Sequence, residues 1–217
     1  MRRRTLVCWG SAHLTAALLL GVVIAFGGGE QPGFDRWWNG MVAAHLDDWM
    51  LAAALMLDHV GGGWVAVVAV PLLVIISLVL GRRPRGALFA AAAFLASAGA
   101  VQLLKNVYGR ARPDDMVVAS DLGSFPSGHT ANAATLAIVV FMLFPRTWVA
   151  LTGTAWVTAM ALSRTLLSVH WATDTLGGAL VGAGVALLLA ASMLPWARTP
   201  SRRRRQAERG LTPEARS

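Results

Sequence analysis

Two ionisable side chains four residues apart, His170 and Asp174, are the first candidates for chemistry in this chain of 217 residues. On a helix, residues at this spacing lie on one face and can touch. The carboxylate of Asp174 can accept the Nδ1–H of the imidazole, which leaves Nε2 with a free lone pair. This pairing is typical of a histidine nucleophile, provided that an electrophile and cations lie nearby.

Earlier segments supply those cations. Lys105 and Arg112 belong to a stretch that ends at Pro113, and Arg164 precedes His170 by six residues. Cations within a largely apolar chain usually mark a site when they do not simply flank a helix end. Three of them around one point suit a phosphate, whose oxygens accept bidentate guanidinium hydrogen bonds.

The tetrapeptide from Pro126 to His129 predicts a helix start that binds an anion. Ser127 is a suitable N-cap, and the N–H groups of Gly128 and His129 would point at the anion. His129 is also a candidate general acid, because cleavage of a phosphate ester needs a proton donor for the leaving oxygen. His129, His170 and Asp174 could instead hold zinc. The surrounding cations favour an oxyanion over a metal ion, so we expect neither metal nor cofactor.

Composition indicates a membrane protein. The chain is 56% hydrophobic with a mean hydropathy of +0.57, and it contains long apolar runs with almost no charge. A net charge of +8 would also suit a nucleic-acid binder, but the cations lie at the ends of apolar segments, which argues against that class. The single cysteine, Cys8, excludes a disulfide framework and a thiolate zinc site.

Six apolar segments approach the roughly 20 residues that a bilayer requires. The first is longer than the apolar part of a signal peptide, so we expect an uncleaved span. The predicted fold class is therefore all-α, a polytopic membrane helix bundle in one domain over residues 1–196, followed by a disordered basic tail over 197–217. The six segments are Leu6–Phe26, Trp64–Leu80, Ala87–Leu104, Ser127–Phe144, Trp148–Leu167 and Asp174–Trp196.

Residues 27–63, between the first two spans, form a mixed segment. The stretch from Asp35 to Met56 predicts an amphipathic helix at the membrane surface. A competing interpretation makes Met50–Leu57 the start of a longer second span, but Asp58 and the glycines at 61–63 interrupt it.

The distribution of positive charge predicts the topology. With the N-terminus inside, most of the 19 Lys and Arg residues fall on the cytoplasmic side, as the positive-inside rule requires. Both termini are then cytoplasmic, and the helix ends that carry the motifs meet at the extracytoplasmic face of the plasma membrane. The remaining charged residues of the loop after the third span are expected to be solvated, with steering of lipid headgroups as the alternative; they are Arg110, Asp114, Asp115 and Asp121.

These motifs resemble those of the type 2 phosphatidic acid phosphatase (lipid phosphate phosphatase) superfamily, which shares its site with the vanadium haloperoxidases. The family pattern is Lys-x(6)-Arg-Pro, Pro-Ser-Gly-His and Ser-Arg-x(5)-His-x(3)-Asp. This chain matches the three parts in order, at 105–113, 126–129 and 163–174.

The resemblance implies a metal-independent mechanism. His170 would attack phosphorus and form a phosphohistidine, Asp174 would orient it, and His129 would protonate the leaving oxygen and then activate water. Ser163 would have a supporting role. The residues implied to hold the phosphate oxygens are Lys105, Arg112, Ser127, Gly128 and Arg164.

The predicted function is an integral-membrane phosphatase. Its substrate would be a polyprenyl diphosphate similar to undecaprenyl diphosphate, or a glycerophospholipid phosphate, hydrolysed at the extracytoplasmic face. The expected partners are this lipid and the bilayer, with no nucleic acid, and the oligomeric state stays open. Two alternatives are a phosphotransferase that uses the same phosphohistidine and a protein that binds or transports a phosphorylated lipid without cleaving it.

Overall fold

The computed structural model describes residues 2–27, 31–61, 65–120 and 123–197. Within these ranges the regular structure is entirely helical, which confirms the all-α prediction. A π-helical segment, η1 (Val65–Ala69), leads directly into α4. The α-helices are α1 (Arg3–Phe26), α2 (Gly33–His45), α3 (Asp48–Gly61), α4 (Val70–Leu80), α5 (Pro84–Tyr108), α6 (Gly128–Leu143), α7 (Thr147–Leu166) and α8 (Ala172–Ala197).

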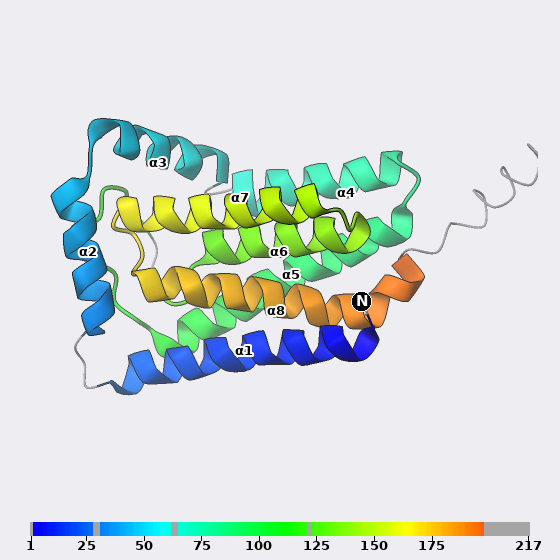
Figure 1. The fold of residues 1–217 in the computed structure, drawn as a ribbon, viewed down its shortest axis with the longest axis horizontal. Coiled ribbons are helices and arrows are strands. Elements are labelled where there is room, and N and C mark those ends of the chain that lie inside the picture. Colours follow the sequence, from blue (N-terminus) through cyan, green and yellow to red (C-terminus); the bar gives the residue numbers. More distant parts are fainter. Residues whose placement is uncertain (1, 28–30, 62–64, 121–122, 198–217) are drawn as a thin grey trace, which may run out of the picture.

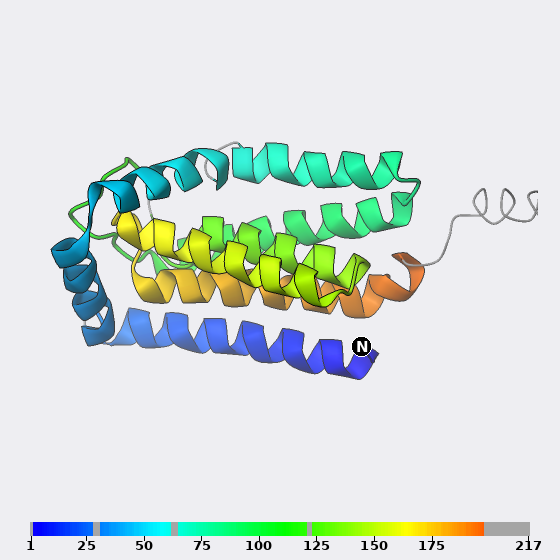
Figure 2. The ribbon, with the colours of Figure 1, turned by 45° about the horizontal axis from the view of Figure 1, so that its top comes forward.

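Helices α1 and α4 to α8 run roughly side by side along one axis, and α2 crosses one end of this bundle (Figures 1 and 2). Helix α8 is central, since it packs against α1, α5, α6 and α7. The C-terminal ends of α5 and α7 and the N-terminal ends of α6 and α8 lie at the same end of the bundle as α2 (Figure 1). Distant segments of sequence are thereby brought to one place.

Helix α5 ends before Gly109, whose left-handed backbone conformation favours glycine. Gly109 has a φ of 53°, and its N–H donates to the carbonyl oxygen of Lys105 at 2.9 Å. This left-handed cap is a typical helix end. It turns the following residues, Arg110 to Pro113, back over the end of the bundle.

Helices α6 and α8 approach so closely that two positions of α8 have no room for a side chain. A Cβ atom on Gly182 would lie 2.8 Å from the carbonyl carbon of Ala131, and one on Gly178 would meet the backbone of Ser127. The Ser127 N–H also donates to the carbonyl oxygen of Asp174 at 2.9 Å. The first turns of α6 and α8, which carry His129 and Asp174, are therefore fixed relative to one another.

The segment from Asp35 to Met56 forms two helices, so the prediction of one continuous helix is wrong. Helices α2 and α3 are bent by 117° at a short break. Leu46 is extended, and the carbonyl of Asp47 accepts the first hydrogen bonds of α3 from Met50 and Leu51. Two adjacent aspartates favour a helix start over a helix interior, which explains the break.

By length and composition, three helices can cross a membrane, namely Arg3–Phe26, Pro84–Tyr108 and Ala172–Trp196 among the described residues. The bent pair of α2 and α3 would make a fourth. Helices α4 and α6 are shorter apolar helices. Helix α5 begins earlier and ends later than the predicted Ala87–Leu104. The count of six spans stays a prediction, and the basic tail, apart from Ala197, lies outside the described residues.

Substitution of Gly182 by Ala is expected to destabilise the protein, because the new methyl group would push α8 away from α6. Overpacking of this kind costs roughly 1–3 kcal/mol, so the thermal midpoint in detergent should fall by several degrees. Gly99→Ala on α5 is the matched control, since a Cβ there meets no atom within 4 Å. Equal midpoints for the two variants would contradict the close packing of α6 and α8.

Candidate active site

His170 lies in the short connection between α7 and α8 and is 3% exposed. Its Nδ1 is 3.4 Å from Asp174 Oδ2, and its Nε2 is 3.3 Å from Arg112 Nη1. The carboxylate therefore faces one side of the imidazole ring, and a guanidinium faces the other. The predicted closeness of His170 and Asp174 is observed, but within the described part of the chain His170 Nδ1 has no hydrogen-bond partner, so the expected hydrogen bond is not formed.

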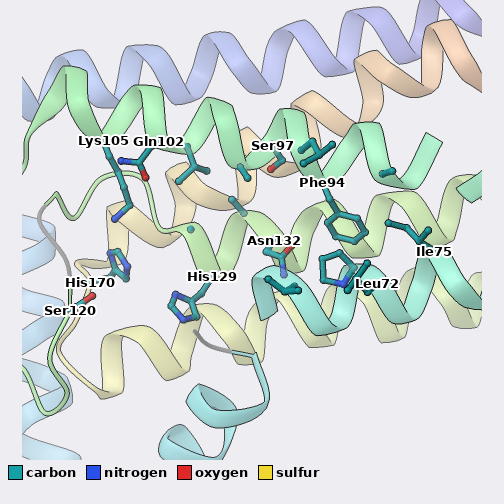
Figure 3. Close-up of a pocket in the computed structure, with 18 of the residues that line it drawn as sticks. Leu72, Ile75, Phe94, Ser97, Gln102, Lys105, Ser120, His129, Asn132 and His170 are labelled. Carbon is teal, nitrogen blue, oxygen red and sulfur yellow. The ribbon is translucent and has the colours of Figure 1, made fainter. Parts of the chain in front are cut away.

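A cavity of about 580 Å³ opens in front of His170. Its polar end is lined by Lys105, Arg112, Gly128, His129 and His170. Figure 3 shows Lys105 pointing toward His170, with His129 close by on the neighbouring helix. The structure thus brings together five of the eight predicted site residues at one end of the cavity.

The other end of the cavity is apolar. It continues between α4, α5 and α6 along residues such as Leu72, Ile75, Phe94 and Leu95 (Figure 3). Asn132, one turn into α6 beyond His129, lies between the two ends. The polar site is therefore the head of a long apolar space.

Two of the predicted phosphate-binding cations are held by loop carbonyls. Lys105 Nζ donates to the Gly123 oxygen at 2.6 Å, and Arg112 Nη2 donates to the same oxygen at 3.3 Å. Arg112 Nη1 also donates to the carbonyl oxygen of Val169, next to His170. These bonds aim both cations at the space in front of the imidazole.

Arg164 is placed differently from the other cations. It is 1% exposed, and its Nη1 donates to Asp58 Oδ1 on α3 at 2.6 Å. Its Nη2 is buried and has no hydrogen-bond partner among the residues that the structure describes. Ser163 supports it, since Arg164 Nε lies 3.4 Å from the Ser163 hydroxyl. Arg164 is thus adjacent to the cavity wall rather than part of it, and Asp58 is a neighbour that no local motif signalled.

Ser127 occupies the N-cap position of α6, as predicted, but its hydroxyl makes no cap hydrogen bond. It accepts a hydrogen bond from the Thr130 hydroxyl at 3.2 Å and is fully buried. Gly128 and His129 follow at the cavity surface. The start of α6 therefore faces the cavity through Gly128 and His129 rather than through the serine side chain.

The prediction that Arg110 is solvated is wrong. Its side chain is 3% exposed and forms ion pairs with Asp174 at 2.5 Å and with Asp35 on α2 at 2.7 Å. The sequence near Arg110 gives no sign of its burial, because its partner Asp35 lies 75 residues away in a helix of mixed composition. Asp114 and Asp115 are exposed, as expected, whereas Asp121 lies outside the described residues.

Burial lowers the pKa of His170 below its usual value. Desolvation disfavours the imidazolium, and the charges of Arg112 and Lys105 act in the same direction, while Asp174 opposes them. The imidazole is therefore neutral at pH 7. A neutral Nε2 facing two cations is suited to attack an electrophile that those cations hold, as a phosphoryl group would be.

The described residues contain no group of three or more His, Cys, Asp or Glu side chains placed to hold a metal ion. The zinc alternative, which required His129, His170 and Asp174 to converge on one point, does not match this geometry.

Comparison with known proteins adds independent findings. The sequence model of the PAP2 superfamily matches residues 86–198, a range that contains all three motifs. The decaprenylphosphoryl-5-phosphoribose phosphatase of Mycobacterium tuberculosis is 36% identical over 149 residues, which cover 64% of this chain and 78% of that protein.

Two solved structures share the fold. The PAP2-type phosphatidylglycerolphosphate phosphatase from Bacillus subtilis matches with a TM-score of 0.65 and 20% identity over 95% of this chain and 98% of that one. LpxE from Aquifex aeolicus matches with a TM-score of 0.61 and 20% identity over 70% of this chain and 91% of that one.

The lowered pKa of His170 predicts that its imidazole protonates only below the ordinary histidine value of about 6.5. The neutral form then persists into mildly acidic solution. NMR of protein labelled with ¹⁵N-histidine measures this directly, and the His170→Gln variant identifies the signal by its loss. A titration midpoint at or above 6.5 would contradict the burial of this ring.

Proposed function

The chain belongs to the PAP2 superfamily and is a phosphatase, and we propose that it removes phosphate from a long-chain lipid, preferably one with a polyprenyl tail. The observation that carries this proposal is the cavity, whose polar end holds His170 and the cations while its remainder is apolar. A phosphorylated lipid has the same division into an anionic head and an apolar tail.

The proposed reaction begins with attack of His170 Nε2 on phosphorus. The new N–P bond forms as the P–O bond to the lipid breaks, and the leaving oxygen takes a proton from His129. Water then attacks the phosphohistidine, His129 takes its proton, and the N–P bond breaks to release phosphate. The residues assigned to the equatorial oxygens are Lys105, Arg112, Arg164, Ser127 and Gly128, in keeping with the resemblance and without a metal ion.

Arg164 gains a second partner in this scheme and keeps the first. Its ion pair with Asp58 occupies one edge of the guanidinium, while the buried Nη2 has no partner in the described part of the chain. A buried donor without an acceptor is costly. An incoming phosphate oxygen would satisfy Nη2 without breaking the pair with Asp58, and Arg164 can therefore act as a ligand from its position behind the cavity wall.

The preference for a polyprenyl tail has two supports. The apolar part of the cavity is lined by aliphatic side chains and Phe94 along α4 and α5. The relative from Mycobacterium tuberculosis is named for a decaprenylphosphoryl compound. A polyprenyl monophosphate, diphosphate or phosphosugar fits these observations, and a glycerophospholipid phosphate is the second choice.

We further propose six spans in the plasma membrane, with both termini in the cytoplasm and the site at the extracytoplasmic face. Six helices lie side by side in the bundle, and η1 lengthens the short α4 (Figures 1 and 2). Arginines at the start of α1 and around the turn between α4 and α5 lie at the end opposite the site, as the positive-inside rule requires. Helix α2 would then lie at the extracytoplasmic surface of the plasma membrane.

We expect purified protein to release phosphate from a polyprenyl phosphate or diphosphate in the presence of EDTA. His170→Ala should lower kcat/KM by about 10³-fold or more, as for other nucleophiles. His45→Ala is the matched control, because that histidine is exposed and bonds only to Met41 of its own helix among the described contacts.

Three results would argue against this function. Full activity of the His170→Ala variant would remove the proposed nucleophile. Transfer of the phosphate to an added lipid alcohol would favour the phosphotransferase, and lipid binding with no phosphate release in any condition would favour a binding protein.

Ala98 on α5 lines the apolar part of the cavity, so Ala98→Phe should obstruct the lipid tail. We expect KM for a long-chain lipid to rise about tenfold, with little change for a water-soluble short-chain phosphate ester. Leu103→Phe is the control, because Leu103 is on the same helix but is 63% exposed and does not line the cavity. An equal effect on long and short substrates would contradict a tail in this space.

A further inference from the structure

Asp35 is a carboxylate buried completely, although the helix that carries it lies at the end of the bundle. Its Oδ1 accepts the backbone N–H of Thr173 at 2.9 Å, and its Oδ2 accepts the Thr173 hydroxyl at 2.5 Å. Its Oδ2 also accepts from Arg110 Nη2 at 2.7 Å. Because burial of a charge is costly, a fully buried carboxylate with three hydrogen bonds indicates a specific structural role and not an incidental surface contact.

Arg110 joins this carboxylate to the candidate active site. One terminal nitrogen donates to Asp174 Oδ1, at 2.5 Å, and to the Thr173 hydroxyl, at 2.8 Å. The other donates to Asp35 and to the side-chain oxygen of Gln31, at 2.7 Å each. The guanidinium also lies over the ring of Trp171. The planar fork of an arginine suits such a bridge between two carboxylates.

The bonds from Arg110 determine which carboxylate oxygen of Asp174 faces His170. Arg110 holds Oδ1, so Oδ2 is left to accept the Trp171 N–H, at 2.9 Å, and to face His170 Nδ1. Rotation of the carboxylate would break the bond to Arg110. Arg110 therefore fixes the orientation of the carboxylate that faces the imidazole.

The second carboxylate, Asp35, also changes the net charge beside the imidazole of His170. If Arg110 paired with Asp174 alone, the two charges would cancel beside the imidazole. With Asp35 sharing the guanidinium, two negative charges and one positive charge leave a net charge of minus one. As Nε2 bonds to phosphorus the imidazole becomes positively charged, and a net negative charge beside Nδ1 stabilises it, especially in a buried site.

We propose that Asp35 and Arg110 form a positioning pair that orients Asp174 and keeps it anionic toward His170, so that helix α2 is part of the catalytic apparatus. The inference rests on the proposed function, because it assigns the pair to the same phosphoryl-transfer step. Neither residue needs to touch the substrate.

The other charged and titratable groups around His170 lie on the Nε2 side of its ring. Arg112 and Lys105 face Nε2 from the loop after α5 and from α5 itself, and His129 faces it from α6. These groups are left unchanged in the variants below. Asp174 and the pair behind it are the groups on the Nδ1 side that the variants alter.

Asp35→Asn keeps the size of the side chain and a carbonyl acceptor but removes the charge. We expect kcat to fall about 10- to 100-fold, by analogy with the loss when the outer partner of a metal-binding histidine is removed, with KM changed by less than about threefold. The titration midpoint of His170, followed by ¹⁵N NMR, should move to lower pH. Thr173→Val is the matched control, because it removes two hydrogen bonds of the same network and leaves every charge in place.

The Arg110→Gln variant should move the titration midpoint of His170 in the direction opposite to that of Asp35→Asn. Removal of the cation leaves two carboxylates near the imidazole, so the titration midpoint of His170 should rise. A purely structural role for the pair would not move the midpoint in opposite directions for the two variants. In an Asp174→Asn background, Asp35→Asn should lower kcat little further, since residues that act through one another are not additive.

Unchanged midpoints in both variants, or the same loss of kcat from Asp35→Asn with and without Asp174, would overturn the inference. If Asp35→Asn does not fold, the Arg110→Gln and Thr173→Val midpoints decide the question. Failure of the proposed function would be distinct, because wild-type protein would then release no phosphate while the His170 midpoint could still respond to the variants.

Discussion

The burial of Asp174 is the constraint on which the rest of the site depends. A carboxylate with no exposed surface must have its oxygens satisfied by the protein. The carboxylate accepts from Arg110, which follows α5, and from the N–H of Trp171, just before α8. The main-chain carbonyl of Asp174 accepts the N–H of Ser127 at the start of α6. The need to satisfy one residue thus draws together the helix ends that carry all three motifs.

The small residues of α8 make this convergence possible. Gly178 and Gly182 allow the backbone of α6 to lie against α8, so that His129 and His170 line one cavity despite forty residues of intervening chain. Close approach through small residues is common where helices pack within lipid, because apolar side chains gain little there by burial alone. The same bundle leaves an apolar space between α4, α5 and α6, which joins the charged end of the cavity to the region where a lipid tail would lie.

The positions of the six main helices could be predicted because each lies within an apolar run, although α4 and α6 are shorter than a full span. The grouping of Lys105, Arg112, His129 and His170 followed from the motifs and from the alternation of helix direction. Local patterns could not reveal partners that are distant in sequence. Asp35 and Asp58 lie on helices of mixed composition, and only the fold places them against Arg110 and Arg164. The stretch from Asp35 to Met56 predicts one helix, but Asp47 and Asp48 favour a helix start, and the chain bends by 117° there.

The central claim is that His170 Nε2 is the atom that attacks phosphorus. Orthovanadate adopts the trigonal-bipyramidal geometry of the phosphoryl-transfer transition state, so it should bind tightly at the nucleophile. A crystal structure of the protein with vanadate tests the claim most directly. We expect vanadium bonded to His170 Nε2, with its equatorial oxygens contacted by Lys105 and Arg112. Vanadate bound to another residue, or bound in the cavity with no bond to His170, would contradict the account.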